Sequence, residues 1–173
     1  MPDGRDAIGS RLEGNVIDRE FIPTDRPNTD NPEVVSGTYV LDMFVSNADR
    51  HKSQWLVTEA GGGTLLRPID FSRAWFKRWP LSLPPFGPGA AMPSQENDNS
   101  AGYYRMAKQH GVITPGEAIH SWETLYQLPK DTWRGIIASV PIGWLHPQQR
   151  IDLINWWWSP QWRTRLSWIK AQL

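Results

Sequence analysis

The stretch FVSNADRHKSQWLVTEAGGGTLLRPIDFSRAW, residues 44–75, decides how the central part of the chain folds. Two apolar runs, WLV and LL, flank the sequence Glu-Ala-Gly-Gly-Gly, and glycine accepts a positive φ without strain. This pattern predicts a β-hairpin over 55–69 with its turn centred on Gly62. Because 62 is also the midpoint of 54 and 70, Gln54 and Asp70 should meet at the open end of the hairpin.

A polar cluster separates this hairpin from the apolar segment before it. Asp49 lies five residues before Gln54, on the loop that leaves the preceding segment, and it can approach the same place as Asp70. Two carboxylates and an amide oxygen are hard ligands of the kind that Mg²⁺ prefers, together with waters and phosphates. The sequence therefore predicts a hard-cation site. The structural alternative is that one aspartate caps a loop and the other ends a strand.

Helical spacing of apolar residues begins before the opening stretch. It predicts a helix from about residue 33 to Asn47, with Asn31 as the N-cap and Pro32 in the first turn. In the last third of the chain, proline and glycine punctuate the pattern. Further helices are expected at about 101–110, 115–127, 130–139, 147–158 and 160–171.

Two segments lack such periodicity. Residues 1–32 mix charges with glycine and proline and are expected to form an irregular N-terminal arm. Residues 80–100 are rich in proline and are expected to form a long loop. A single domain over 33–173 follows, and its expected fold class is mainly α with a small β-hairpin.

The composition limits the class of protein. Eighteen Lys and Arg balance eighteen Asp and Glu, so no overall charge favours nucleic acid or an anionic membrane surface as a partner. The absence of cysteine excludes disulfides, thiolate catalysis and cysteine-based metal centres. The first residues lack the apolar run of a signal peptide, and no stretch reaches the roughly 18 apolar residues of a membrane span. We expect a soluble, cytoplasmic protein with no membrane partner.

Tryptophan is the outlying residue type, with eleven copies in the chain. A stripe at helical spacing, which core packing explains, is formed by Trp162, Leu166, Ile169 and Leu173. Trp156, Trp157 and Trp158 would sit about 100° apart on a helix and span about 200° of its circumference. A helix buried on two sides is the favoured explanation. The alternatives are a ring in a protein interface and a platform for single-stranded nucleic acid, which the neutral charge disfavours.

The run SNADRHKSQWLV followed by LLRPIDFSRAW resembles the catalytic loop and the metal-binding segment of the HipA-like kinases, distant relatives of protein kinases. The resemblance covers residues 33–75 and is weaker in IGSRLEG and SVPIGWLHPQQRIDLINWW. It implies a protein-kinase-like (HipA-like) C-lobe over 33–173. Asp49 would be the base that orients the acceptor hydroxyl, and Asp70, with Gln54, would hold Mg²⁺ against the phosphates of ATP. Arg50 and His51 would brace the loop.

Two features depart from the pattern of these kinases. Such kinases usually have Asn where this chain has Gln54, and the first lysine of the chain, Lys52, comes after the position of a nucleotide-binding strand lysine. One expectation is therefore a serine/threonine kinase C-lobe that transfers a phosphoryl group from ATP and takes its nucleotide-binding lobe from a partner chain. The alternative is a catalytically inactive pseudokinase that serves as a regulatory module and binds a protein partner or target.

Overall fold

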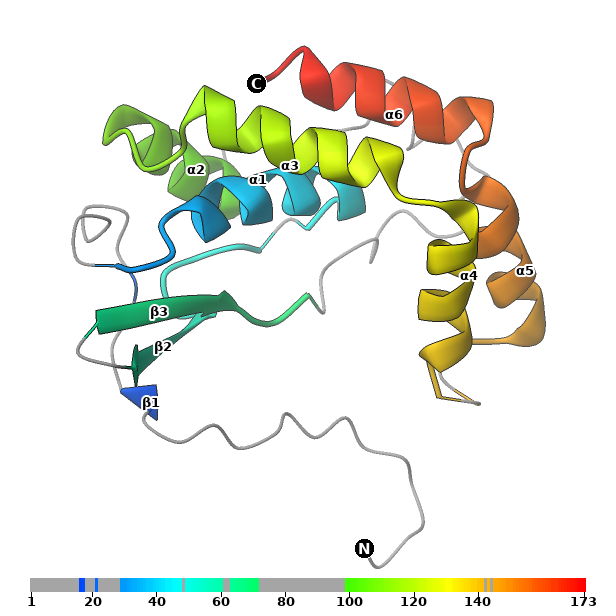
Figure 1. Cartoon of the computed structure of the whole chain (residues 1–173), viewed down its shortest axis with the longest axis horizontal. Helices are drawn as coiled ribbons and strands as arrows, with labels where there is room; N and C mark the ends of the chain where they lie inside the picture. Colours follow the sequence, from blue (N-terminus) through cyan, green and yellow to red (C-terminus); the bar gives the residue numbers. More distant parts are fainter. Residues whose placement is uncertain are drawn as a thin grey trace, which may run out of the picture.

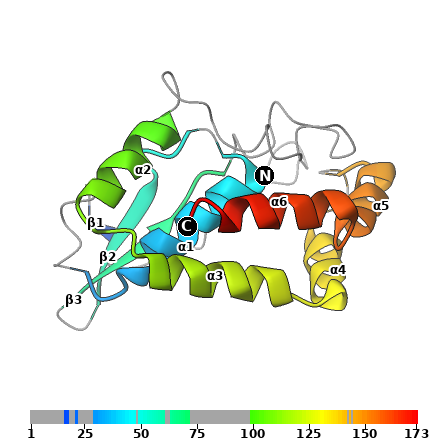
Figure 2. The same ribbon diagram turned by 90° about the horizontal axis from the view of Figure 1, so that it is seen from above.

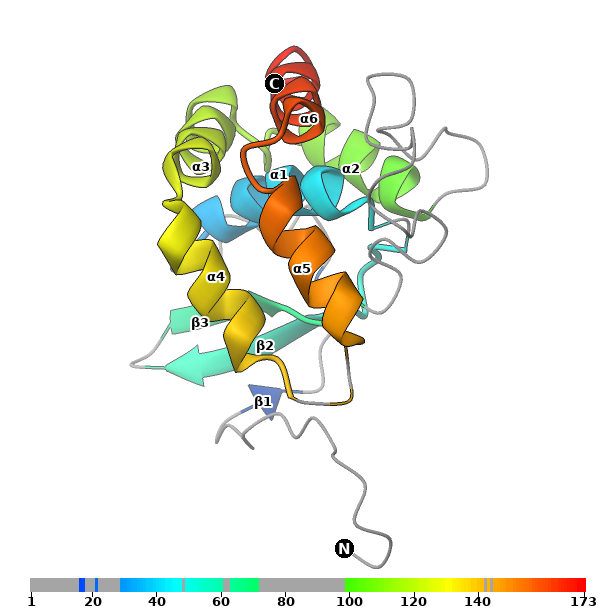
Figure 3. The same cartoon turned by 90° about the vertical axis from the view of Figure 1, so that its right-hand side faces the viewer.

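Helix α1 (Glu33–Val45) lies between a small β-sheet and a layer formed by α3 (Pro115–Gln127) and α6 (Pro160–Lys170), as Figures 1 and 3 show. This computed structural model describes residues 16–17, 21, 29–47, 49–60, 63–71, 99–141, 143 and 145–173. Seen from above in Figure 2, α3 and α6 run alongside each other. The expected fold class, mainly α with a small hairpin, is confirmed in these coarse terms.

The predicted hairpin is present as β2 (Trp55–Ala60) and β3 (Gly63–Pro68), paired in antiparallel fashion. Its register differs from the expectation, because Trp55 pairs with Pro68 and Ala60 pairs with Gly63. The centre of this pairing thus falls between residues 61 and 62 and not on Gly62. Neither residue is among those that the structure describes. Gln54 consequently lies opposite Ile69, whose N–H donates to the Gln54 carbonyl oxygen at 3.0 Å.

A third strand, β1 (Val16–Ile17), pairs with β2 on the side away from β3. Phe21, a little further along, is buried and packs edge to face on Trp55 with 5.4 Å between ring centroids. The sequence analysis did not predict this strand, and most of the expected arm at 1–32 lies outside the described residues. The strand is too short to produce a periodic signal, and its partner is distant in sequence.

The predicted first helix is confirmed over Glu33–Val45, and Ser46 ends it in a left-handed conformation with φ 54°. The expected N-cap is wrong: Pro32 occupies that position, and no side chain caps the helix. The Asn31 side chain contacts β3 instead. Its Nδ2 donates to the Leu66 carbonyl oxygen, and its Oδ1 accepts the Leu66 N–H, both at 2.8 Å. Asn31 thus fastens the start of α1 to the hairpin.

The helices predicted in the last third are confirmed. With α3 and α6 they are α2 (Asn99–Gln109), α4 (Lys130–Ser139) and α5 (Pro147–Trp156). Helices α3, α5 and α6 each begin with proline, and the side chain of the preceding Thr114, His146 or Ser159 accepts a backbone N–H of the first turn. Both features are local start signals. The predicted loop at 80–100 lies outside the described residues as far as 98, and its last two residues belong to α2.

The three consecutive tryptophans do not share a helix, because α5 ends at Trp156. Trp156 and Trp157 are buried, and the Trp157 ring stacks on Trp133 with 4.5 Å between centroids. Trp158 has a positive φ of 67° and is 46 % exposed. The expectation of one helix buried on two sides is therefore wrong, although two of the three rings are core residues. Of the predicted stripe, Trp162, Leu166 and Ile169 are buried as expected, whereas Leu173 is partly buried and lies beyond the end of α6.

None of the helices that the structure describes is both long enough and apolar enough to span a membrane.

Replacing Asn31 with alanine should weaken the link between α1 and the hairpin. The change removes two hydrogen bonds to the Leu66 backbone, and it leaves partly buried peptide groups without them, so we expect the free energy of unfolding to fall by about 1–3 kcal/mol. Denaturant unfolding monitored by circular dichroism measures this loss. Asn155→Ala is the matched control, because Asn155 is exposed on α5 and its loss should cost less than about 0.5 kcal/mol. Equal losses in the two variants would contradict the assigned role.

Candidate functional site

The open end of the hairpin brings Gln54 and Asp70 together. Gln54 Nε2 donates to Asp70 Oδ2 at 3.4 Å. Asp70 is exposed and adopts a left-handed backbone with φ 57°, which ends the extended run of β3. Gln54 is only 4 % exposed, and its Oε1 is buried without a hydrogen-bond partner among the described residues. The contact predicted from the hairpin is therefore present, although the strand register places Ile69, and not Asp70, opposite Gln54.

Arg50 holds both sides of this open end from within the core. Its guanidinium is fully buried, and Nη1 donates to the carbonyl oxygens of Gln54 at 3.0 Å and of Ile69 at 2.6 Å. The guanidinium carbon lies 4.7 Å from the centroid of the Phe71 ring and 5.6 Å from that of Trp55. Arg50 therefore holds the loop and the two hairpin ends together through these two carbonyl oxygens.

Asp42 is the functional-site neighbour that the sequence analysis missed. This carboxylate of α1 is buried and accepts Arg50 Nε at 2.8 Å and Nη2 at 3.1 Å. It also accepts Asn47 Nδ2 at 3.0 Å and the Tyr104 hydroxyl of α2 at 2.5 Å. A signal was present, because Asp42 follows Tyr39 by three positions on the buried face of the predicted helix. Aspartate is rarely buried there unless it is paired.

The pKa shifts in this cluster follow from burial and from Asp42. Burial alone lowers the pKa of Arg50, but the hydrogen bonds and the charge of Asp42 outweigh burial, and the pKa is raised overall. Burial raises the pKa of Tyr104 well above its usual value, and the nearby Asp42 carboxylate raises it further. Burial likewise raises the pKa of Tyr103. Arg50 thus remains charged and Tyr104 remains a neutral donor.

Asp49 and His51 lie on the loop on either side of Arg50. The Asp49 N–H donates to Asn47 Oδ1 at 3.4 Å, and the Arg50 N–H donates to Ser100 Oγ at 2.6 Å. His51 Nδ1 lies 2.8 Å from Ser53 Oγ, and the His51 carbonyl oxygen accepts the Gln54 N–H at 3.1 Å. These bonds fix the backbone on both sides of Arg50.

The open end of the hairpin offers two side-chain oxygens that could contribute to a cation site. Over the described part of the chain, no group of three or more His, Cys, Asp or Glu side chains could hold a metal ion. The oxygens that could contribute are the carboxylate of Asp70 and the buried Oε1 of Gln54. Mg²⁺ is commonly bound by one or two protein oxygens and completed by waters and phosphates. The two oxygens at the hairpin end are therefore of the kind that Mg²⁺ prefers.

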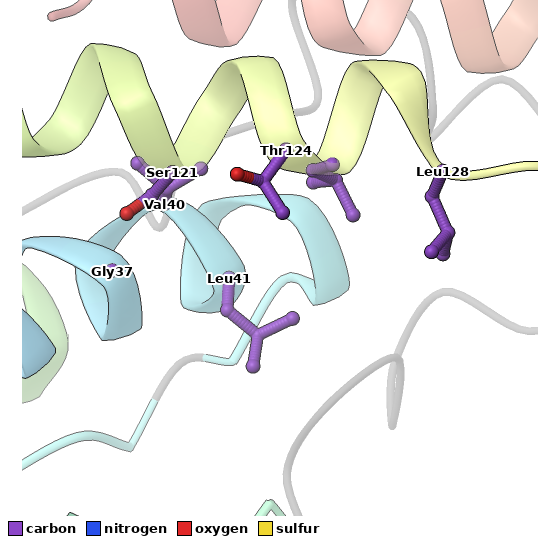
Figure 4. Close-up of a pocket in the computed structure, with 7 residues that line it drawn as sticks. Gly37, Val40, Leu41, Ser121, Thr124 and Leu128 are labelled. Atoms are coloured by element: carbon purple, nitrogen blue, oxygen red, sulfur yellow. The ribbon is translucent and has the colours of Figure 1, made fainter.

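A separate apolar pocket of about 200 Å³ lies between α1 and α3 (Figure 4). It is lined by Gly37, Val40, Leu41, Ser121, Thr124, Leu125 and Leu128. None of these residues belongs to the predicted site, and no ionisable side chain lines the pocket. It therefore offers no group for acid–base or metal chemistry.

Comparisons with protein-family models, with curated proteins and with solved structures found no match to this chain.

The raised pKa of Tyr104 predicts a dependence of stability on alkaline pH. Tyrosine in the unfolded chain loses its proton near pH 10, whereas folded Tyr104 keeps its proton to a higher pH. Above about pH 10 the folded state therefore binds more protons than the unfolded state. The contribution of Tyr104 to stability is complete below pH 10 and is lost as the pH rises further, at up to about 1.4 kcal/mol per pH unit.

Tyr104→Phe removes this titration, and at pH 8 it should cost about 1.5–3 kcal/mol because a hydrogen bond to a carboxylate is lost. The difference in unfolding free energy between wild type and variant should then shrink between pH 9 and pH 11. Urea unfolding at a series of pH values measures both effects. Parallel curves over this range would show that Tyr104 is not the titrating group.

Proposed function

We propose that this chain is a HipA-like serine/threonine kinase C-lobe that, together with a nucleotide-binding lobe from a partner chain, transfers a phosphoryl group from ATP to a hydroxyl group. The observation that carries the proposal is the contact of Gln54 with Asp70 at the hairpin mouth, 3.4 Å apart and braced by buried Arg50. The resemblance of this loop and hairpin to the catalytic and metal-binding segments of such kinases supports it.

Each site residue has a role in this proposal. Asp49 orients the acceptor hydroxyl and accepts its proton, while Asp70 and Gln54 Oε1 hold the cation. When bound, Mg²⁺ neutralises charge on the phosphates of ATP. Arg50 and His51 keep the loop and the hairpin ends in place, and phosphoryl transfer depends mainly on such positioning.

One observation favours the second candidate, a catalytically inactive pseudokinase that binds a protein partner. Gln54 presents its Nε2 to Asp70, so the carboxylate already accepts a hydrogen bond where a cation would lie. Binding of Mg²⁺ by Gln54 would require the amide to turn and present Oε1. A scaffold that binds a protein partner needs no such rearrangement.

Stabilisation by Mg²⁺ with ATP tests the cation site. A ligand at ten times its Kd stabilises the folded state by about 1.4 kcal/mol, which corresponds to a rise in Tm of about 3–5 °C for a chain of this length. Asp70→Asn should abolish this rise and leave the free energy of unfolding without ligand within about 0.5 kcal/mol of wild type, because Asp70 is exposed. Asp131→Asn, at an exposed position of α4, should retain the full rise. Equal stabilisation of the Asp70 variant and the wild type would refute the site.

Transfer of labelled phosphate from ATP to serine or threonine separates the kinase from the pseudokinase. Asp49→Asn should keep the thermal stabilisation by Mg²⁺ with ATP but lower the transfer rate by about 10²–10⁴-fold, as expected when a general base is lost. Stabilisation of the wild type without any transfer, even when the chain is isolated from its native host together with its bound partners, would favour the pseudokinase. An Asp49 variant as active as the wild type would remove Asp49 from the proposed mechanism.

A further inference from the structure

Helix α2, although it lies far along the chain, contributes one buried hydroxyl group to the loop that carries Asp49 and another to Asp42 of α1. Ser100 Oγ accepts the Arg50 N–H at 2.6 Å and donates to the Asn47 carbonyl oxygen at 2.9 Å. The Tyr104 hydroxyl donates to Asp42 Oδ2 at 2.5 Å. Both side chains are buried. The loop is therefore held by α2 as well as by its own neighbours.

The Arg50 guanidinium has its position set on two sides. On one side, Asp42 accepts Nε and Nη2, and on the other, Nη1 donates to the carbonyl oxygens of Gln54 and Ile69. One of these carbonyls belongs to Gln54 and the other to the residue before Asp70. Because the guanidinium is a rigid planar fork, any rotation of it changes the spacing of the two hairpin ends.

The Asp42 carboxylate has no free acceptor position with which to hold a rotated Arg50 guanidinium. Its two oxygens accept four hydrogen bonds, from Arg50 twice, from Asn47 and from Tyr104. The Tyr104 hydroxyl and Arg50 Nε share Oδ2. Loss of the tyrosine donor would leave a buried carboxylate oxygen undersatisfied, and such a group moves to recover a partner. A shift of the Asp42 carboxylate would also shift the Arg50 guanidinium that is hydrogen-bonded to it.

We propose that Asp42 and Tyr104 are positioning residues for the candidate site: through Arg50 they set the spacing of Gln54 and Asp70, and thereby the affinity of the site for a divalent cation. The part concerning the cation rests on the proposed function, whereas the part concerning the hairpin ends does not. Neither residue touches the cation. Their effect is exerted through the two backbone carbonyls that Arg50 holds.

Hydrogen exchange distinguishes positioning from a general contribution to the core. The Ile69 N–H donates to the Gln54 carbonyl oxygen at 3.0 Å and reports directly on the hairpin mouth. In Tyr104→Phe under native conditions, we expect this amide to accelerate about tenfold more than the amide of Val57, in the middle of β2, which should accelerate by no more than the loss of global stability accounts for. Tyr104→Phe is preferable to replacement of Asp42, which would leave Arg50 buried without its counter-ion and could prevent folding.

Tyr103→Phe is the matched control. Tyr103 is a buried tyrosine of the same helix, and the hydroxyl that donates to Asp42 is that of Tyr104. Tyr103→Phe should leave the exchange rate of the Ile69 amide unchanged. Equal acceleration of all amides in Tyr104→Phe, or acceleration of Ile69 in both variants, would overturn the positioning role.

Titration with Mn²⁺, followed by electron paramagnetic resonance, tests the consequence for the site. Tyr104→Phe should weaken Mn²⁺ binding about tenfold, and Tyr103→Phe should not change it. Equal Mn²⁺ affinity in wild type and Tyr104→Phe would overturn the link to the site. If wild type binds no Mn²⁺, both the proposed function and the cation part of this inference fail. Hydrogen exchange at the Ile69 amide then decides whether Asp42 and Tyr104 position the hairpin ends.

Discussion

A guanidinium buried as completely as that of Arg50 needs a counter-ion and hydrogen-bond acceptors, because removing an ion from water costs several kcal/mol. Asp42 supplies the charge, and the backbone of Gln54 and Ile69 supplies further acceptors. These groups come from α1, from the loop and from the end of the hairpin. The ion pair is satisfied only when all three are in place, so it links the formation of the site to the folding of the core.

The pairing of Arg50 with Asp42 also affects the electrostatics of the candidate site. The charge of Arg50 is directed at Asp42, which it contacts through two nitrogens, and the rings of Phe71 and Trp55 lie close to the guanidinium. The Arg50 fork meets carbonyl oxygens at the hairpin mouth and not the carboxylate of Asp70. The backbone next to Asp70 is thus held by Arg50, whose charge is already paired with that of Asp42.

Local signals explain which parts of the fold could be predicted. Three helices of the last third, α3, α5 and α6, begin at proline after a capping side chain, and the hairpin is marked by its glycines, so neighbouring residues suffice to locate them. The parts that were missed depend on distant partners. Asn31 bonds to Leu66 and is not a helix cap, and β1 exists through its pairing with β2. No periodicity in the sequence reports such contacts.

The same distinction applies to the candidate site. The symmetry of the hairpin predicted the contact of Gln54 with Asp70. The contact forms although the predicted centre of the turn was wrong, because the backbone at Asp70 departs from the extended conformation. The participation of Asp42 and Tyr104 could not be predicted, because it depends on how α1 and α2 pack. A charged residue on an apolar helix face shows that a partner exists. It does not identify that partner.

The fixed starts of α3, α5 and α6 constrain how this chain can tolerate changes in length. Proline and its preceding cap hold the first residue of each helix in place, so an inserted residue cannot be absorbed by moving the start. An insertion early in α6 would rotate every later side chain by about 100° and would turn Leu166 and Ile169 out of the core that they fill. Insertions and deletions are therefore expected to be accommodated between these helices and not within them.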